Sequence, residues 1–343
     1  MTTELQQTRG SVKIEGKIVG FDKTQENSYR KGNTKESNKP YRSISLGVKT
    51  SPTNMIYQLN QFGMVPEKAS KIIKFKGRGN KEHFEIDYAH KSEIPDGAGV
   101  MGFGIVGVGD GEQGKQTIKN YFAYDAVEKI ANEYSNEDSV VINGEFDIDT
   151  YESNGESKTT VKYNMKKIWL TKDPIDFDKE DFNEVASFEQ EFVVVNHNLD
   201  KEAKKLYVTG RLITFKKDWH DITFTIDLSK HEILGQNIYK KTKFGDILKV
   251  QGIIVNGVVL VEAPVQEFDW GGETPAGQQN VIGSRISELQ ITNVLEHKAK
   301  VYKEDDFFKA ADFSSNDPWT KAATNNNSKD VDPFAESAGS FEW

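Results

Sequence analysis

The sequence predicts an all-β-dominated protein built from two small barrels in tandem, followed by a disordered acidic C-terminal tail. Three observations predict this fold. A strand pattern with a central glycine occurs four times, a second strand pattern occurs twice, and the C-terminal stretch lacks hydrophobic periodicity. The chain has 343 residues, which is enough for two domains of ordinary size and a tail.

The glycine pattern reads apolar, any, apolar, any, glycine, any, apolar, and it occurs at residues 12–18, 140–146, 206–212 and 248–254. Alternation with a period of two is typical of a half-buried strand. Glycine at a core-facing position of a strand usually marks a bend or a bulge, where the sheet coils. Small closed barrels need such corners, so the four segments predict barrel strands.

The second pattern, at residues 163–168 and 289–294, places apolar residues at the first, third and sixth positions. Each copy follows the second glycine strand of a pair. The order is therefore glycine strand, further strands, glycine strand and closing strand, and this order occurs twice. Such an order indicates an internal duplication of an all-β unit.

The two units differ in length, because the glycine strands of the first pair lie much further apart than those of the second. The first unit is therefore predicted to contain an insertion at about residues 65–135, which ends in a helix at 124–134. A stretch rich in Lys and Asp at 172–187 is predicted to be the linker. The predicted divisions are a first domain at 1–175, a second domain at 186–303 and a tail at 304–343.

The repeated glycine strands resemble those of the OB-fold, a five-stranded barrel in which the first and fourth strands commonly carry such a glycine. The resemblance covers roughly residues 9–172 and 188–300. It implies two OB-fold-like barrels, each with a binding face flanked by the loop between its first two strands.

Cations and aromatic residues are predicted to face outward on both units. Residues 1–81 contain sixteen Lys or Arg against six Asp or Glu, a net charge of +10, although the whole chain carries −9. Bases stack on aromatic rings while cations follow phosphates, so this surface favours single-stranded nucleic acid. The predicted nucleic-acid-binding residues are Lys13, Lys17, Tyr29, Arg30, Lys31, Tyr41, Arg42, Tyr57, Lys74, Phe75, Lys76, Arg78, Tyr207, Arg211, Phe215, Lys216, Lys217 and Trp219.

The tail combines acidic residues with widely spaced aromatic ones. Residues 304–343 contain nine Asp or Glu against three Lys. Such a segment cannot repay the entropy of ordering alone, but its aromatic residues can anchor it in a basic, apolar pocket of another protein. The predicted partner-binding residues are Asp317, Pro318, Trp319, Asp332, Pro333, Phe334, Phe341 and Trp343.

No pattern in the sequence indicates an enzyme, a cofactor or a metal site. The chain has no cysteine, and its six histidines are not at metal-ligand spacing. Residues 109–116 have the spacing of a phosphate loop, but glutamine replaces the final Ser or Thr. Residues 102–107 match a dinucleotide fingerprint without a βαβ context, which favours a glycine-rich hairpin. The polar N-terminus and the lack of a long apolar run favour the cytoplasm and no membrane partner.

Taken together, the chain resembles the single-stranded DNA-binding proteins of bacterial and bacteriophage replication. Bacterial members have acidic tails that often carry Asp-Pro-Phe repeats, which 332–334 match and 317–319 match with Trp for Phe. The final Phe-Glu-Trp and the presence of two barrels depart from the bacterial pattern, so the resemblance implies a phage-encoded version acting in the host cytoplasm. It implies a non-enzymatic protein that binds single-stranded DNA during replication, recombination or repair, and that recruits replication or recombination proteins through its tail. The alternatives are a structural or assembly protein with OB-like barrels and an RNA-binding regulator.

Overall fold

The computed structural model describes residues 4–21, 29–35, 37–75, 81–94, 98–99, 103–109, 116–153, 156–261 and 282–307. Most of these residues lie in β-strands, and the elements other than strands are two α-helices and two short 3₁₀ helices. The predicted all-β-dominated fold class is confirmed. No helix within these ranges is long and apolar enough to cross a membrane.

The first group of strands pairs in a ring. β1 pairs with β3, β3 with β4, β4 with β11, β11 with β10, and β10 with β1 again. The β4–β11 pairing is parallel and the others are antiparallel. We call this the first ring. Its strands are β1 (Gly10–Val19), β3 (Pro40–Lys49), β4 (Met55–Met64), β10 (Ser139–Ser153) and β11 (Glu156–Leu170). The edge strand β2 (Arg30–Asn33) pairs with β3, and helix α1 (Ala123–Glu133) follows the insertion.

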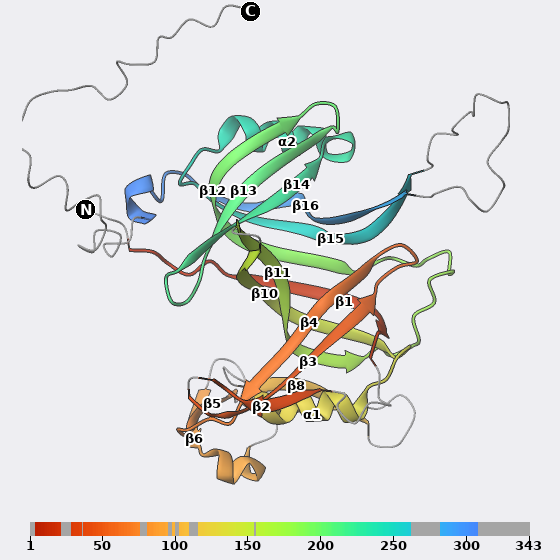
Figure 1. Cartoon of the computed structure of the whole chain (residues 1–343), viewed down its shortest axis with the longest axis vertical. Coiled ribbons are helices and arrows are strands. Elements are labelled where there is room, and N and C mark those ends of the chain that lie inside the picture. Colours follow the sequence, from red (N-terminus) through yellow and green to blue (C-terminus); the bar gives the residue numbers. More distant parts are fainter. Residues whose placement is uncertain are drawn as a thin grey trace, which may run out of the picture.

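The second group repeats the same scheme. β12 pairs with β13, β13 with β14, β14 with β16 in parallel, β16 with β15, and β15 with β12. We call this the second ring. Its elements are β12 (Ala186–Asp200), β13 (Lys205–Ile213), β14 (Trp219–Asp227), α2 (Leu228–Lys241), β15 (Ile247–Val261) and β16 (Ile282–Lys298). In both rings the helix occupies the same place in chain order, between the third and fourth strands (Figure 1).

The repeat that the sequence predicts is offset by one strand from the repeat formed by the two rings. Both copies of the closing pattern lie where expected, in β11 and β16, which are the last strands of their rings. The glycine strand at 206–212 is β13, however, and is the second strand of its ring rather than the first. The expectation that the second unit begins with a glycine strand is therefore wrong, because β12 precedes it and occupies the position of β1.

The alternation of side chains predicted from the sequence is present in the strands. Val12, Ile14 and Ile18 are buried on β1, and Leu206 and Val208 are buried on β13. These residues belong to one continuous apolar core that extends through both rings. The core is completed by helix α1, which buries Ala126, Val127, Ile130 and Ala131 against the first ring.

Glycine is required in the barrel strands by close backbone approach. A Cβ added at Gly16 would lie 2.2 Å from the carbonyl oxygen of Lys49, so β1 can cross β3 only with glycine there. Gly144 lies at a register shift between β10 and β11, which is the bulge that the sequence pattern predicts.

The insertion of the first ring forms a small sheet and a hairpin. The sheet contains β5 (Ser70–Phe75), β6 (Lys81–Ile86) and β7 (Ala98–Gly99), and η1 (Tyr88–Glu93) follows β6. The hairpin of β8 (Phe103–Gly109) and β9 (Gln116–Phe122) confirms the glycine-rich hairpin, and β8 joins the first ring through β11. The predicted helix at 124–134 is confirmed as α1, whereas α2 was not predicted.

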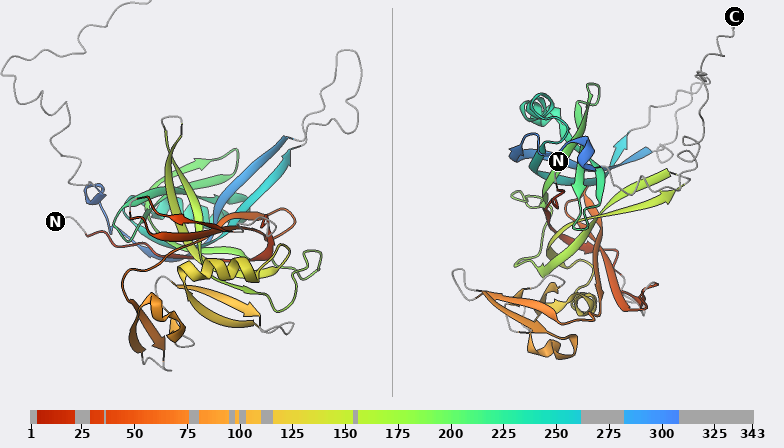
Figure 2. Two further views of the ribbon diagram at one scale, coloured as in Figure 1. Left: turned by 60° about the horizontal axis from the view of Figure 1, so that its bottom comes forward. Right: turned by 90° about the vertical axis from the view of Figure 1, so that its left-hand side faces the viewer.

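The two rings are joined directly. β12 pairs with β1 over five residue positions, so the sheets of both rings are continuous (Figure 2). A second junction forms at Asn54, in the turn between β3 and β4. Its side-chain amide donates hydrogen bonds to Glu184 at 2.7 Å and to the Ile254 carbonyl at 2.9 Å, and its oxygen accepts one from the Asn256 amide at 2.7 Å. We call this junction the Asn54 clasp.

The predicted linker at 172–187 is not a free connection. The Phe177 ring lies beneath the ammonium groups of Lys17 and Lys49, at 5.5 and 5.7 Å from its centroid. Glu184 belongs to the Asn54 clasp. The segment is therefore packed along the junction of the rings rather than spanning it as a flexible tether.

Candidate nucleic-acid interface

The outer face of β2, β3 and β4 carries an aromatic surface next to cations. Residues directly opposite each other on neighbouring strands project on the same side of a sheet. Register therefore places Arg30, Ser43 and Phe62 in one row, and Gly32, Tyr41 and Met64 in the next. We call these rows, together with Tyr57 at the other end of β4, the β3 face.

The large side chains of the β3 face are unusually exposed. Phe62 is 49% exposed, Tyr57 is 45% exposed and Met64 is 41% exposed. The rings of Tyr41 and Phe62 stack on each other with centroids 5.7 Å apart and an interplanar angle of 26°. Exposed apolar side chains that gather on one face, instead of being scattered singly, indicate a binding surface.

Cations border this face on the edge strand β2. Arg30 and Lys31 are both exposed, and Arg30 projects in the same row as Phe62. Lys31 lies opposite Arg42 and projects to the other side of the sheet. The β3 face therefore combines flat aromatic rings with a neighbouring guanidinium, an arrangement that suits bases and phosphates.

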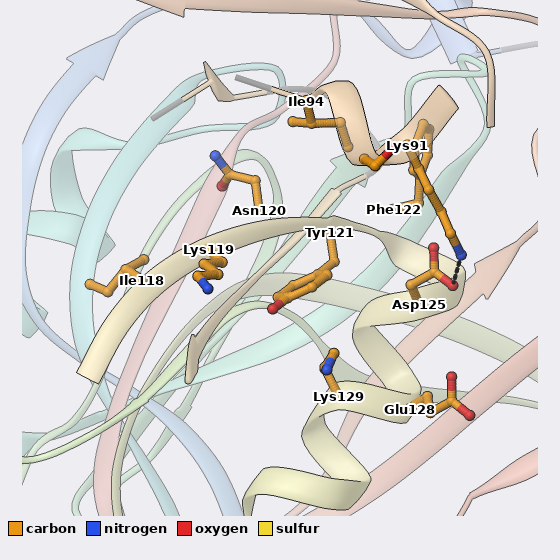
Figure 3. A pocket seen from close by; sticks show the side chains of 11 residues that line it. Lys91, Ile94, Ile118, Lys119, Asn120, Tyr121, Phe122, Asp125, Glu128 and Lys129 are labelled. Atoms are coloured by element: carbon orange, nitrogen blue, oxygen red, sulfur yellow. Dashed lines mark hydrogen bonds and ion pairs between the residues drawn. The ribbon is translucent and has the colours of Figure 1, made fainter. Parts of the chain in front are cut away.

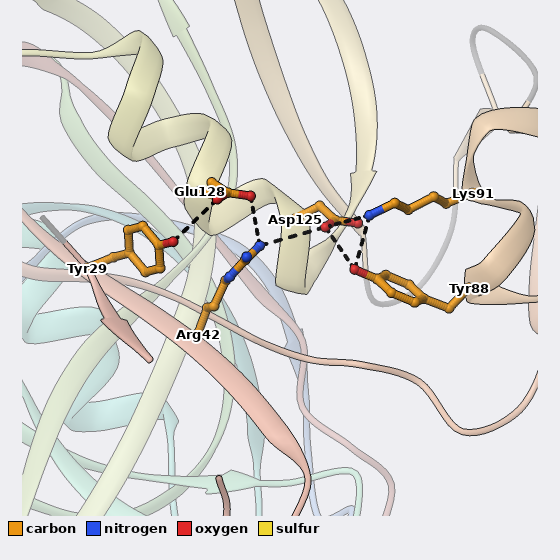
Figure 4. Close-up of polar contacts among 6 residues, drawn as sticks. All are labelled: Tyr29, Arg42, Tyr88, Lys91, Asp125 and Glu128. Carbon is orange, nitrogen blue, oxygen red and sulfur yellow. Dashed lines mark hydrogen bonds and ion pairs between the residues drawn. The ribbon is translucent and has the colours of Figure 1, made fainter. Parts of the chain in front are cut away.

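Arg42 and Tyr29 point away from the β3 face and take part in an internal network with α1 (Figure 4). The Arg42 guanidinium lies 2.9 Å from the Glu128 carboxylate and 3.8 Å from that of Asp125. It also lies over the Tyr124 ring, 4.1 Å from the centroid. Tyr29 donates a hydrogen bond to Glu128 at 3.4 Å. Because these contacts hold both side chains against α1, on the side away from the β3 face, we leave Arg42 and Tyr29 out of the candidate interface.

The same network reaches the insertion. Asp125 accepts hydrogen bonds from Lys91 at 3.0 Å and from the Tyr88 hydroxyl at 2.9 Å. Burial opposes the charge of Lys91, but the hydrogen bonds to Asp125 and Tyr88 outweigh it and raise the pKa of Lys91. Burial raises the pKa of Tyr88, and its hydrogen bond to Asp125 adds to the effect. The network thus holds η1 against the start of α1.

The two candidate lysines of β1 differ in their surroundings. Lys13 faces outward and forms an ion pair with Glu15 at 2.7 Å. Lys17 also faces outward, but it packs over the Phe177 ring of the segment between the rings. Neither residue lies in the rows that make up the β3 face.

The candidate residues of the second ring divide into two sets. Arg211 binds Asp221 through two hydrogen bonds of 2.6 and 2.7 Å, and its guanidinium lies 4.6 Å from the Phe307 centroid. Trp219 contacts the same Phe307 ring edge-on at 5.5 Å. Phe307 belongs to η2 (Glu304–Phe307) and is buried. Arg211 and Trp219 thus lie together around Phe307, and the segment before the tail covers them.

The second set is exposed except for Tyr207. Phe215 is 79% exposed at the turn between β13 and β14, with Lys216 and Lys217 next to it. Lys217 forms an ion pair with Glu4 of the N-terminal segment. Tyr207 is half-buried on the outer side of β13. The second ring therefore presents fewer aromatic residues in a shared row than the β3 face does.

Several predicted residues lie outside the described residues. These are Lys76, Arg78 and all of the predicted tail residues: Asp317, Pro318, Trp319, Asp332, Pro333, Phe334, Phe341 and Trp343. For Lys74 and Phe75 the structure describes only their place on β5. Their roles stay predictions.

Sequence reasoning missed Phe62 and Met64. The available signal was the alternation within β4, where Ile56, Leu59 and Gln61 are buried and Phe62 and Met64 are exposed. A buried glutamine beside an exposed phenylalanine reverses the usual pattern, so hydrophobicity did not identify which side of β4 faces outward. Among the residues that the structure describes, no cluster of three His, Asp or Glu side chains could hold a metal ion.

Comparison with known proteins identifies a family. A family model described as YorF matches residues 106–326, which is more than half of the chain. No curated protein sequence matches the chain. Among solved structures, the chain is similar to the single-stranded DNA binding protein from Thermus aquaticus, both wild type and a deletion mutant, at 10% identity and a TM-score of 0.37. These alignments cover 86% of this chain and 94% and 96% of those chains.

Proposed function

This chain belongs to the YorF family, and we propose that it binds single-stranded DNA with little sequence preference during replication, recombination or repair. The observation that carries the proposal is the β3 face. There, a stacked Tyr41–Phe62 pair and the exposed Tyr57 lie on one sheet surface, beside the exposed Arg30. We further propose that each ring is a closed OB-type barrel, within domains at 1–175 and 186–303, and that the protein acts without catalysis in the cytoplasm, that of the host if it is phage-encoded.

The β3 face suits unpaired bases better than a duplex. Every base has a flat face that can stack on an aromatic ring, whereas the bases of a duplex are already stacked on each other. Each base stacked on a protein ring contributes about 1–3 kcal/mol, and the contribution does not depend strongly on sequence. Arg30 would meet the phosphate backbone at the margin of the face. Binding is therefore expected to weaken as salt increases.

Replacing Phe62 by alanine tests this proposal. Loss of one stacking ring should raise the Kd for oligo-dT about tenfold, which corresponds to about 1.4 kcal/mol. Tyr41→Ala should have a similar effect. Fluorescence anisotropy with labelled oligo-dT measures both variants, and thermal melting checks their folding. Tyr239→Ala is the matched control, because Tyr239 is an aromatic residue of α2 that is also 50% exposed.

The same titration distinguishes the alternatives. Tighter binding to oligo-U than to oligo-dT would favour an RNA-binding regulator. Absence of binding to oligo-dT, oligo-U and duplex would favour a structural or assembly protein, whose partner would then cover the exposed β3 face. Wild-type affinity in Phe62→Ala and Tyr41→Ala would contradict the β3 face as the binding surface.

We also propose that the tail recruits replication or recombination proteins. This proposal rests on the sequence of residues 316–343, in which Asp-Pro-aromatic triplets are separated by polar residues. Affinity capture should retain such proteins on the full chain and lose them when residues 312–343 are deleted. DNA affinity should be unchanged or higher in the deleted protein. Equal capture by both proteins would rule out the tail as the recruiting element.

A further inference from the structure

A cavity of about 410 Å³ lies between the edge strand β9, helix α1 and the turn η1 (Figure 3). The Tyr121 ring lies within it, between Lys119 of the same strand and Lys129 of α1. Ile118, which is 58% exposed, adds apolar surface. The cavity thus combines one aromatic ring, two flanking ammonium groups and an apolar wall. None of its residues was predicted to bind nucleic acid from the sequence.

The carboxylates of the cavity are already neutralised by other partners. Asp125 is bound by Lys91, and Glu128 is bound by Arg42 from the opposite side of α1. Lys119 and Lys129, in contrast, have no carboxylate partner among the described residues. The Lys129 ammonium lies 5.8 Å from the centre of the Tyr121 ring. Two cations beside one ring are therefore available for a ligand.

Tyr121 is suited to act as a neutral stacking surface. Burial raises the pKa of its phenol, and the nearby Glu133 carboxylate raises it further. A tyrosine hydroxyl is protonated at neutral pH in any case, so the ring adds no negative charge beside the two lysines. Glu133 is the remaining acidic group near the ring, so the cluster of Lys119, Lys129 and Tyr121 keeps a positive balance at the cavity.

The cavity and the β3 face lie on opposite sides of β4. A Cβ added at Gly63 would lie 2.1 Å from the backbone of Ala123 and Tyr124, so β4 touches α1 where this helix begins. Phe62 and Met64 flank Gly63 on the outer side of β4, and β9 ends at the residue before Ala123. A strand lying on Phe62 would therefore have to pass from the outer side of β4 to the side on which α1 lies before it reaches Tyr121, which requires a longer oligonucleotide.

We infer that this cavity is an additional binding site for single-stranded DNA, which takes one base on the Tyr121 ring and the adjoining phosphates at Lys119 and Lys129. The inference rests on the proposed function, since it extends the DNA path from the β3 face onto the insertion. A short oligonucleotide can occupy the β3 face alone. Only a longer one can also reach the cavity.

The test is a Lys119→Ala/Lys129→Ala double variant measured with oligo-dT of two lengths, about 6 and about 30 nucleotides, chosen around the site size of one OB-type barrel. Affinity for the short oligomer should stay at the wild-type value, whereas affinity for the long one should fall about tenfold. On single strands each phosphate contact contributes about 0.7 to the slope of log K against log salt. Two lost contacts should therefore lower the slope for the long oligomer by about 1.4. Tyr121→Leu should reduce affinity for the long oligomer while leaving its salt slope unchanged.

The matched control is Lys240→Ala/Lys241→Ala, which removes the same charge from exposed positions of α2. Equal losses in the control and the test variant would show a net-charge effect and overturn the inference. Wild-type affinity of the Lys119/Lys129 variant for the long oligomer would overturn it as well, while leaving the proposed function intact. If the unmodified protein binds neither oligomer, the proposed function itself fails.

Discussion

Replacing Asn54 by alanine is expected to destabilise the protein by about 3 kcal/mol, because this side chain of the first ring satisfies polar groups of β15 and of the segment between the rings. Asn54 is 8% exposed, and it bonds the Ile254 carbonyl and the Asn256 amide of β15. Alanine would leave these groups without a partner at a buried junction. Each buried donor or acceptor left unsatisfied costs about 1–3 kcal/mol.

Chemical denaturation followed by circular dichroism measures this effect. The unfolding midpoint of Asn54→Ala should fall clearly below that of Asn293→Ala, which removes an exposed asparagine from β16 and should cost little. Asn54→Asp should also destabilise, since a carboxylate cannot donate to the Ile254 carbonyl. Equal midpoints for Asn54→Ala and Asn293→Ala would show that the clasp contributes nothing.

The Asn54 clasp also bears on how DNA could be held. The β1–β12 pairing and the clasp together join the rings at two separate places. Two junctions restrict rotation of one ring about the other, which a single linker could not do. The β3 face and the exposed Phe215 turn are therefore held at a constant spacing, rather than moving as independent modules.

The strands could be predicted because their signal is local. Alternation over 12–18 and 206–212 depends only on neighbouring residues, and the buried positions of β1 and β13 agree with it. The start of the second ring could not be located in this way. β12 lacks the glycine pattern, and its place in the ring depends on pairing with β1, β13 and β15, which are distant in sequence.

The residues of the candidate site were also difficult to predict, because their partners are distant in sequence. Tyr41, Arg42 and Ser43 are consecutive, so alternation alone would place Arg42 on the side opposite to Tyr41. The charge of Arg42 nevertheless made it a candidate for binding phosphates. Its real partners, Glu128 and Asp125, lie more than eighty residues away on α1. No local pattern reports such a partner, so charge by itself overestimates the number of free cations.

Replacing Arg42 by alanine should therefore lower stability without weakening the binding of a short oligo-dT to the β3 face. The Arg42 and Asp125 side chains are only 17% and 15% exposed, so the substitution would leave a mostly buried carboxylate with Lys91 as its remaining cation. Removing one partner of a buried charge pair costs about 3–5 kcal/mol, and the partial exposure of Glu128 places this case near the lower end. Arg42→Lys should recover little, because an ammonium cannot reproduce the flat stacking on Tyr124.

Arg30→Ala is expected to have the opposite effects on stability and on DNA affinity, although Arg30 lies on the strand next to that of Arg42. Arg30 is exposed on β2, so its loss should leave the unfolding midpoint unchanged and remove about one phosphate contact from DNA binding. Measuring both quantities for both variants separates a structural arginine from a binding one. Reduced DNA affinity in a fully stable Arg42→Ala protein would contradict the internal role. The contacts of Arg42 with α1 predict that Arg42→Ala is destabilised but still binds the short oligomer. Arg30→Ala, in contrast, should be stable and bind the short oligomer less tightly.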